Sequence, residues 1–150
     1  MRSALLAGLA LAGALLAAGC GGREVVVRDD GGRVVARAAL PEDGRFALAY
    51  RHSYYRVPAR EEFRAGDGGF RMVGVASPSE AVLDYYAIAG AKSAGRWMTL
   101  APERPRRFER LPLIATATGR RTLEVGGRRY PLYAQAPRHL TIEVEEGRWP

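Results

Sequence analysis

Alternation between large and small side chains is the clearest pattern in the chain, and it runs furthest between residues 46 and 54. Every second position there carries a large group: Phe46, Leu48, Tyr50, His52 and Tyr54. Successive side chains of a strand point to opposite faces. The pattern therefore predicts a strand over 46–54, whose core face carries one imidazole among aromatic rings and whose other face is smaller and more polar.

Shorter stretches rich in β-branched or alternating residues occur along the rest of the chain. They predict strands over 24–28, 33–40, 60–64, 70–75, 95–100, 113–116, 121–125, 128–133 and 139–145. Gly, Asp and Pro residues separate most of them, as is typical of turns. Pro131 favours an edge position for its strand, because proline has no N–H to donate. In the last stretch Leu140, Ile142 and Val144 share one face.

One segment shows helical signals instead. Ser77-Pro78-Ser79-Glu80 has the residues of a capping box, with Ser77 as the cap and Pro78 at the first helical position. The sequence predicts a short helix from there to about Ile88, ended by Gly90.

Many short strands, frequent glycine turns and one helix predict a mainly β fold. We expect an antiparallel β-sandwich or a partly open barrel with one short helix. The alternative is an α+β fold in which the helix covers one sheet. Residues 24–150 are long enough for a single β-rich domain with a hydrophobic core of its own.

The N-terminal residues have the features of a targeting segment. The run from Ala4 to Ala18 contains only Ala, Leu and Gly, and it is shorter than the roughly 20 residues of a bilayer-spanning helix. Residues 1–19 are therefore predicted to be a signal peptide. The end of the run, Leu16-Ala17-Ala18-Gly19-Cys20, resembles the lipobox of bacterial lipoproteins, with Ala17 where Leu is usual.

That resemblance implies a lipid on the thiol of Cys20 and a location in the cell envelope, outside the cytoplasm and anchored to a membrane. Residues 20–23 would then form the lipidated cysteine and a flexible tether. The alternative is an ordinary secretory peptide and a secreted or periplasmic soluble domain.

Composition narrows the functional classes. The chain has 23 Lys and Arg against 16 Asp and Glu, a formal charge of +7. The basic balance could favour an acidic partner or an anionic surface, but no long basic run points to nucleic acid. Cys20 is the only cysteine, which excludes an internal disulfide. The two histidines, His52 and His139, have no metal-ligand spacing, so no metal and no cofactor is predicted.

Two kinds of site chemistry remain. A small hydrolase would use His52 with Glu61 or Glu62 as an acid–base pair. Neighbours on a strand face opposite ways, so Ser53 cannot pair directly with His52 as a nucleophile. A binding groove would instead combine tyrosines with Arg51 and Arg56, whose guanidinium groups suit carboxylates. The alternatives without a functional role are a half-buried structural histidine, solvated glutamates, and tyrosines that fill the edge of a core.

The middle third of the chain resembles a small extracytoplasmic family of unknown function, the one numbered eighteen-fifty among such domains. The resemblance rests on residues 46–53, Val57-Pro58 and Glu62-Phe63, and extends to the 77–86 segment. At His52, Ser53 and Glu62 the chain matches recurring positions of the family, which has no agreed catalytic residues. Its members are often encoded beside TRAP-type permeases of the TAXI class, which implies an accessory role in solute uptake.

The leading hypothesis is therefore a non-enzymatic lipoprotein domain. It would bind a small anionic solute, a TRAP-type permease or the solute-binding protein of that permease. The surface expected to do so surrounds Arg51, His52, Ser53 and Glu62. The alternatives are the small hydrolase and a structural envelope lipoprotein without a small ligand.

Overall fold

The structure is a computed structural model that describes residues 22–147. The predicted signal peptide and the lipidation position, Cys20, lie outside the described residues. The described chain forms two antiparallel sheets and one short helix, α1 (Glu80–Tyr85). The predicted mainly β fold with one short helix is thereby confirmed.

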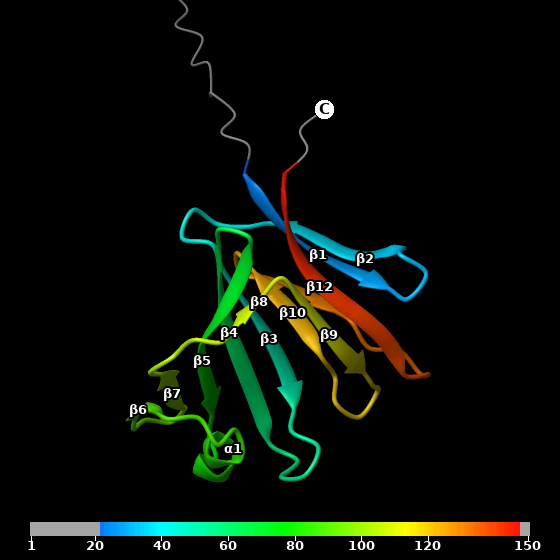
Figure 1. Ribbon diagram of the computed structural model, residues 1–150. Coiled ribbons are helices and arrows are strands. Elements are labelled where there is room, and N and C mark those ends of the chain that lie inside the picture. Colours follow the sequence, from blue (N-terminus) through cyan, green and yellow to red (C-terminus); the bar gives the residue numbers. More distant parts are fainter. Residues whose placement is uncertain (1–21, 148–150) are drawn as a thin grey trace, which may run out of the picture.

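Sheet A has four strands. Their order is β2 (Val34–Ala39), β1 (Arg23–Asp29), β12 (Arg138–Glu146) and β9 (Arg110–Ala115). The strands come from both ends of the described chain, and the start of β1 pairs with the end of β12 (Figure 1).

Sheet B holds the remaining eight strands. Their order is β11 (Arg128–Pro131), β10 (Thr122–Val125), β3 (Arg45–Arg51), β4 (Pro58–Gly66), β5 (Gly69–Ser77), β7 (Met98–Pro102) and β6 (Gly90–Ser93), with β8 (Arg107–Phe108) paired to β5. Neither sheet closes on itself, because β2 and β9 end sheet A and β11 and β6 end sheet B. The edge position predicted from Pro131 is confirmed by β11.

One hydrophobic cluster joins the two sheets. Sheet A contributes the inward residues of β1 and β12, and sheet B contributes the alternate large residues of β3, β4 and β5. Phe46 stacks on Phe63 with 5.2 Å between ring centroids, and Phe70 meets Phe46 edge-on at the same distance. Leu140 and Ile142 are buried in this cluster as their alternation predicts.

The strand predicted over residues 46–54 is shorter in the structure. β3 ends at Arg51, and the chain turns at His52 instead of continuing to residue 54. The turn is closed by the His52 N–H, which donates to the Val57 carbonyl at 2.8 Å, and by the Arg56 N–H, which donates to the His52 carbonyl at 2.9 Å. Tyr54 is consequently 77% exposed and is no part of the core face.

The predicted capping box is also wrong. Ser77 is the fully buried last residue of β5, and the N-cap of α1 is Ser79, which makes no side-chain cap hydrogen bond. The Ser77 hydroxyl donates instead to the Pro58 carbonyl at 2.9 Å and accepts the Ser79 N–H at 3.2 Å. Ser77 therefore ties the start of β4 to the start of the helix.

Two strands have no counterpart in the sequence prediction. The polar β6 and the two-residue β8 carry no alternation that marks them as strands, and they form by pairing with β7 and β5. Within the described residues no helix is long and apolar enough to cross a membrane.

Candidate functional site

Two loops meet where β3 ends, and they build the region of interest. One loop follows β3 and the other precedes β10, which pairs with β3. The Arg51 N–H donates to the Gly119 carbonyl at 2.7 Å, which joins the loops directly. The second loop is held in shape by the Thr116 hydroxyl, which accepts the Gly119 N–H at 3.0 Å. Residues almost 70 positions apart in sequence thus lie side by side.

A groove of about 680 Å³ runs over the outer face of sheet B beside these loops. We call it the outer groove. Ala49 on β3 and Ala76 on β5 keep its floor low, because they flank the longer Arg60 of β4 in one cross-strand row. Its walls carry five arginines, two glutamates and one tryptophan: Arg51, Arg56, Arg60, Arg120, Arg129, Glu62, Glu124 and Trp97.

The arginines of the outer groove fall into two groups. Arg60 lies 3.1 Å from a carboxylate oxygen of Glu124 and 3.3 Å from one of Glu62, and Arg129 lies 3.2 Å from Glu124. These two arginines are neutralised within the groove.

The other group, Arg51, Arg56 and Arg120, forms no ion pair with any residue of the described chain. The Arg51 guanidinium donates only to the Arg56 carbonyl, at 2.9 Å. Three cations therefore share one end of the outer groove without a carboxylate, which is the arrangement expected of a site for an anion.

Backbone conformation sets Arg56 and Arg120 apart as well. Their φ angles are 59° and 49°, and in residues 22–147 Ala87 is the only other non-glycine residue with positive φ. The left-handed conformation costs a residue with a side chain about 1–2 kcal/mol. Strain of this kind is often found where a loop positions a functional group. Here it occurs at two of the three unpaired arginines.

A second hollow, the end cavity, lies on the inner side of the same sheet end and has a volume of about 540 Å³. Three polar groups in its wall form a chain. The Tyr86 hydroxyl donates to Glu61 Oε1 at 2.6 Å, and the Tyr50 hydroxyl is hydrogen-bonded to that of Tyr86. The Arg121 guanidinium lies over the Tyr50 ring at 5.0 Å from its centroid. Arg120 and Arg121 therefore serve opposite sides of sheet B.

Burial governs the titration of the tyrosines. It raises the pKa of Tyr50 to about 12 from a usual 10.0, and it raises the pKa of Tyr86 further, with the charge of Glu61 adding to the effect. Both phenols are thus protonated near neutral pH and act as hydrogen-bond donors in the chain that ends on Glu61.

His52 is 4% exposed and sits among tyrosine rings, as the sequence predicts. The Tyr85 ring meets it edge-on at 4.8 Å and the Tyr55 ring lies at 5.2 Å. The Tyr55 N–H donates to His52 Nδ1 at 3.3 Å, which places the proton of a neutral ring on Nε2. Burial lowers the pKa of His52, so the imidazole stays neutral and holds the turn.

The four residues predicted to share one surface are divided by sheet B. Arg51 and Glu62 line the outer groove, whereas His52 and Ser53 line the end cavity, and Arg51 alone reaches both. His52 lies on the core side, as the alternation that begins at Phe46 predicts, and Ser53 lies exposed in the turn that follows β3. Neither of these two hollows is therefore lined by all four residues.

The structure also shows no contact within either acid–base pair of the hydrolase hypothesis. In residues 22–147 no hydrogen bond or ion pair joins His52 to Glu61 or Glu62. Glu61 lies on the core face of β4 and is bound by Tyr86, while Glu62 lies on the outer face opposite Ala47. A carboxylate on the core face needs a hydrogen-bond donor, and the Tyr86 hydroxyl supplies one to Glu61.

The sequence analysis missed several residues that line the two hollows, among them Trp97, Arg120 and Arg121. Arg120 and Arg121 belong to a Gly-Arg-Arg turn that reaches the site only because β10 pairs with β3. Trp97, 41% exposed, lies within the strand predicted over 95–100, but it precedes β7, which begins at Met98. Gly95, two residues before it, is the local sequence signal that could have marked this segment as a loop.

A larger hollow of about 860 Å³ continues from the outer groove along the same face. Arg45, Arg60 and Arg129 in its wall are paired with neighbouring carboxylates, which leaves Arg128 as its one arginine without an ion pair in the described chain. It therefore offers an anion less than the outer groove does. In the described part of the chain no three His, Cys, Asp or Glu side chains gather in a way that could hold a metal ion.

Comparison of the chain with known proteins finds no matching family model, no matching curated protein and no matching solved structure. The resemblance to the eighteen-fifty family thus stays a prediction, and the functional argument depends on the geometry of this chain.

Proposed function

We propose that this protein is a non-enzymatic binding domain and that its outer groove takes a small organic anion. The observation that carries the proposal is the group of three arginines without carboxylate partners, Arg51, Arg56 and Arg120. A carboxylate or phosphate bound among them would supply the missing negative charge through charge-assisted, two-pronged hydrogen bonds.

The shape and the lining of the outer groove support a ligand of modest size. Its volume of about 680 Å³ falls within the roughly 300–1,000 Å³ that is usual for small-molecule sites. Trp97 offers an aromatic face beside the arginines, suited to a planar or apolar portion of the ligand. The paired Arg60, Glu62 and Glu124 can accept and donate hydrogen bonds further along the floor.

The other two functions fit the geometry less well. A hydrolase lacks a contact between its histidine and a carboxylate, and general acid–base catalysis needs hydrogen-bond reach. A purely structural lipoprotein gives no reason for three unpaired cations over a concave surface. The binding function is therefore the one that we put forward.

Isothermal titration calorimetry of residues 22–150 with citrate, succinate and inorganic phosphate tests the proposal. At least one of these anions should bind, with an affinity that falls as salt is added. Arg120→Gln should weaken that binding about tenfold, because a charged hydrogen bond of roughly 1.5 kcal/mol is lost.

Arg71→Gln is the matched control. Arg71 is exposed on β5, forms no ion pair in the described residues and does not line the outer groove. Its replacement removes the same charge and should leave the affinity unchanged. Equal weakening by both variants would show general charge attraction in place of a site, and no binding of any of the three anions would refute the proposal.

We also infer that the domain works outside the cytoplasm as a lipoprotein, next to a TRAP-type permease or its solute-binding protein. The support is the lipobox-like sequence at Cys20 together with the family resemblance. Labelled palmitate should enter the wild-type chain and be absent from Cys20→Ala. Affinity purification from solubilised membranes should recover a permease or a solute-binding protein, and recovery of neither would contradict the partnership.

A further inference from the structure

A third hollow, which we call the side cleft, opens between the two sheets where β9 forms the edge of sheet A. Its volume is about 580 Å³. Most of its wall is apolar, with residues from both sheets and from the connections between them: Phe63, Met72, Ile88, Phe108 and Leu111. An apolar wall of this extent, open to solvent on one side, suits the body of a small hydrophobic molecule.

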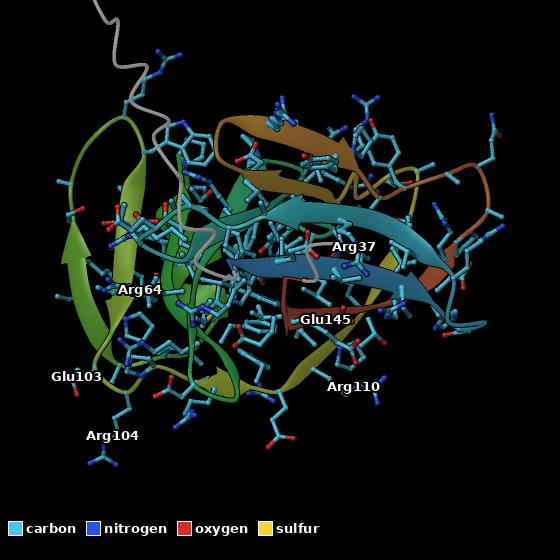
Figure 2. The ribbon with its side chains drawn as sticks, turned by 90° about the horizontal axis from the view of Figure 1, so that it is seen from above. Arg37, Arg64, Glu103, Arg104, Arg110 and Glu145 are labelled. Atoms are coloured by element: carbon cyan, nitrogen blue, oxygen red, sulfur yellow. The ribbon has the colours of Figure 1, made fainter. Side chains whose placement is uncertain are left out.

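The mouth of the side cleft is cationic. Arg104, Arg106 and Arg110 line it, and all three are exposed. Arg110 is paired with Glu143 at 2.7 Å, and Arg106 lies over the Phe108 ring at 5.1 Å from its centroid. In Figure 2 both residues lie along the lower margin of the view, with Arg104 at the left pointing away from the body of the molecule and Arg110 further to the right.

Neither Arg104 nor Arg106 forms an ion pair within the described chain. Glu103, next to Arg104 in sequence, does not line the cleft. The mouth therefore has a net positive charge.

The inner part of the cleft has the opposite charge. Glu61 lies on the core face of β4, opposite Leu48 and Val75 of the neighbouring strands. One of its oxygens accepts the Tyr86 hydroxyl, and in residues 22–147 no Arg or Lys forms an ion pair with it. Glu61 and Tyr86 also line the end cavity, so this hydrogen-bonded pair lies between the two hollows.

We propose that the side cleft binds an amphipathic monocarboxylate, with the carboxylate at Arg104 and Arg106 and the apolar body between the sheets, and that Glu61 rejects a ligand with a second anionic end. The order of charges carries the inference: cations at the mouth, an apolar middle and a carboxylate within. A molecule with one charged end matches this order, whereas a dicarboxylate of the same length would bring its far end towards Glu61.

This site is independent of the outer groove. The two hollows have no lining residue in common, since the outer groove lies on the far face of sheet B. Binding in one can therefore fail while binding in the other holds.

Methyl NMR gives a readout specific to the side cleft. The described chain has two methionines, Met72 in the wall of the cleft and Met98 outside it. With ¹³C-methyl methionine, titration of decanoate should shift the Met72 signal in a saturable way and leave that of Met98 in place. Decanedioate, which has the same length and a carboxylate at each end, should bind about tenfold more weakly because of repulsion by Glu61.

Two variants separate the roles of the charged groups. Arg106→Gln should weaken decanoate binding several-fold, and Arg71→Gln, which removes an exposed charge from the residue next to Met72, should not. Glu61→Gln keeps a carbonyl that can accept the Tyr86 hydroxyl and should bring decanedioate close to decanoate in affinity.

Equal affinity of the wild-type protein for the two acids would overturn the role of Glu61. A Met72 signal that does not move with decanoate, or that moves only together with Met98, would overturn the site itself. Neither result bears on citrate binding in the outer groove, so failure here and failure of the proposed function can be told apart.

Discussion

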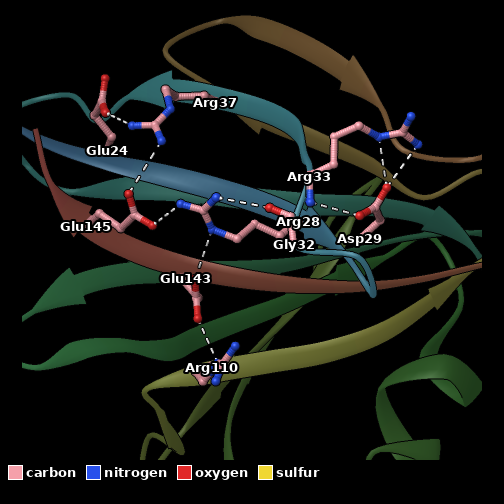
Figure 3. Close-up of polar contacts among 9 residues, drawn as sticks. All are labelled: Glu24, Arg28, Asp29, Gly32, Arg33, Arg37, Arg110, Glu143 and Glu145. Atoms are coloured by element: carbon pink, nitrogen blue, oxygen red, sulfur yellow. Dashed lines mark hydrogen bonds and ion pairs between the residues drawn. The ribbon is translucent and has the colours of Figure 1, made fainter. Parts of the chain in front are cut away.

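The outer faces of the two sheets are both rich in arginine, but they differ in whether these arginines have carboxylate partners. On sheet A every arginine of the group drawn in Figure 3 has a carboxylate beside it. Arg28 is paired with Glu143 at 3.5 Å and Glu145 at 2.6 Å, and Arg37 with Glu24 at 2.6 Å. In the outer groove of sheet B three arginines have no such partner.

The difference shows which charges indicate a function. Alternating cations and anions on neighbouring strands make a stable, solvated face, and such pairs each contribute little. We call the paired charges around Arg28, Arg33, Arg37 and Arg110 the sheet A network. It needs no ligand to neutralise its charge. Arg51, Arg56 and Arg120 repel one another, and two of them occupy a strained backbone conformation. A bound anion would offset both unfavourable terms, so the imbalance in charge is more informative than the number of arginines.

Placing a carboxylate in the outer groove should have the largest effect, because it would remove the difference in charge pairing between the two sheets. Ala49→Glu sets an acid two residues before Arg51 on the same face of β3 and opposite Arg60. It should imitate the sheet A network and lower citrate affinity more than tenfold, because the new carboxylate both neutralises and repels. Calorimetry measures the effect, and Ala49→Gln controls for the size of the side chain. A glutamate variant that binds citrate as well as the glutamine variant would contradict the model of an anion site.

Removing an acid from the sheet A network is the converse change, with a smaller effect. Glu143→Gln deprives Arg110 of its partner and Arg28 of one of two. We expect the free energy of unfolding to fall by about 1 kcal/mol at low salt and by less at high salt. Urea unfolding at both salt concentrations measures it.

Glu103→Gln is the control for this change, since Glu103 is exposed and forms no ion pair in the described chain. It should leave stability unchanged. Citrate affinity should be the same in both variants, and a marked loss in Glu143→Gln would mean that the two faces are not independent.

Sequence reasoning succeeded for strands whose own residue pattern shows which face is buried. A run of valines located β1. Alternation located β3, β10 and β12 and placed Leu140 and Ile142 on the buried face, because a core on one face of a sheet fixes the register. It failed where the structure depends on contacts between two segments that are far apart in the sequence. β3 stops at Arg51, whose N–H donates to the Gly119 carbonyl, and the turn that follows is closed by hydrogen bonds among His52, Arg56 and Val57. The residues of that turn do not predict these contacts.

The residues of the candidate site could be named only in part for the same reason. Arg51 and Glu62, both named from the sequence, line the outer groove. His52 was grouped with them, although alternation places it on the core face, and there it lies. Arg120 could not be placed from sequence because its position depends on the pairing of β10 with β3. A left-handed arginine is equally hidden, since arginine has no preference for that conformation.

The smallest expected effect concerns one backbone dihedral angle, the φ of Arg56. Arg56, with φ of 59°, occupies a conformation that glycine adopts freely and alanine does not. Arg56→Gly and Arg56→Ala both remove the guanidinium, so both should weaken citrate binding to the same extent. Their stabilities should differ, with the glycine variant more stable than the alanine variant by roughly 0.5–1 kcal/mol in urea unfolding, because only alanine retains the strain. Equal stabilities would mean that the loop relaxes without cost, and the unpaired charge would then be the only unfavourable term that an anion has to offset.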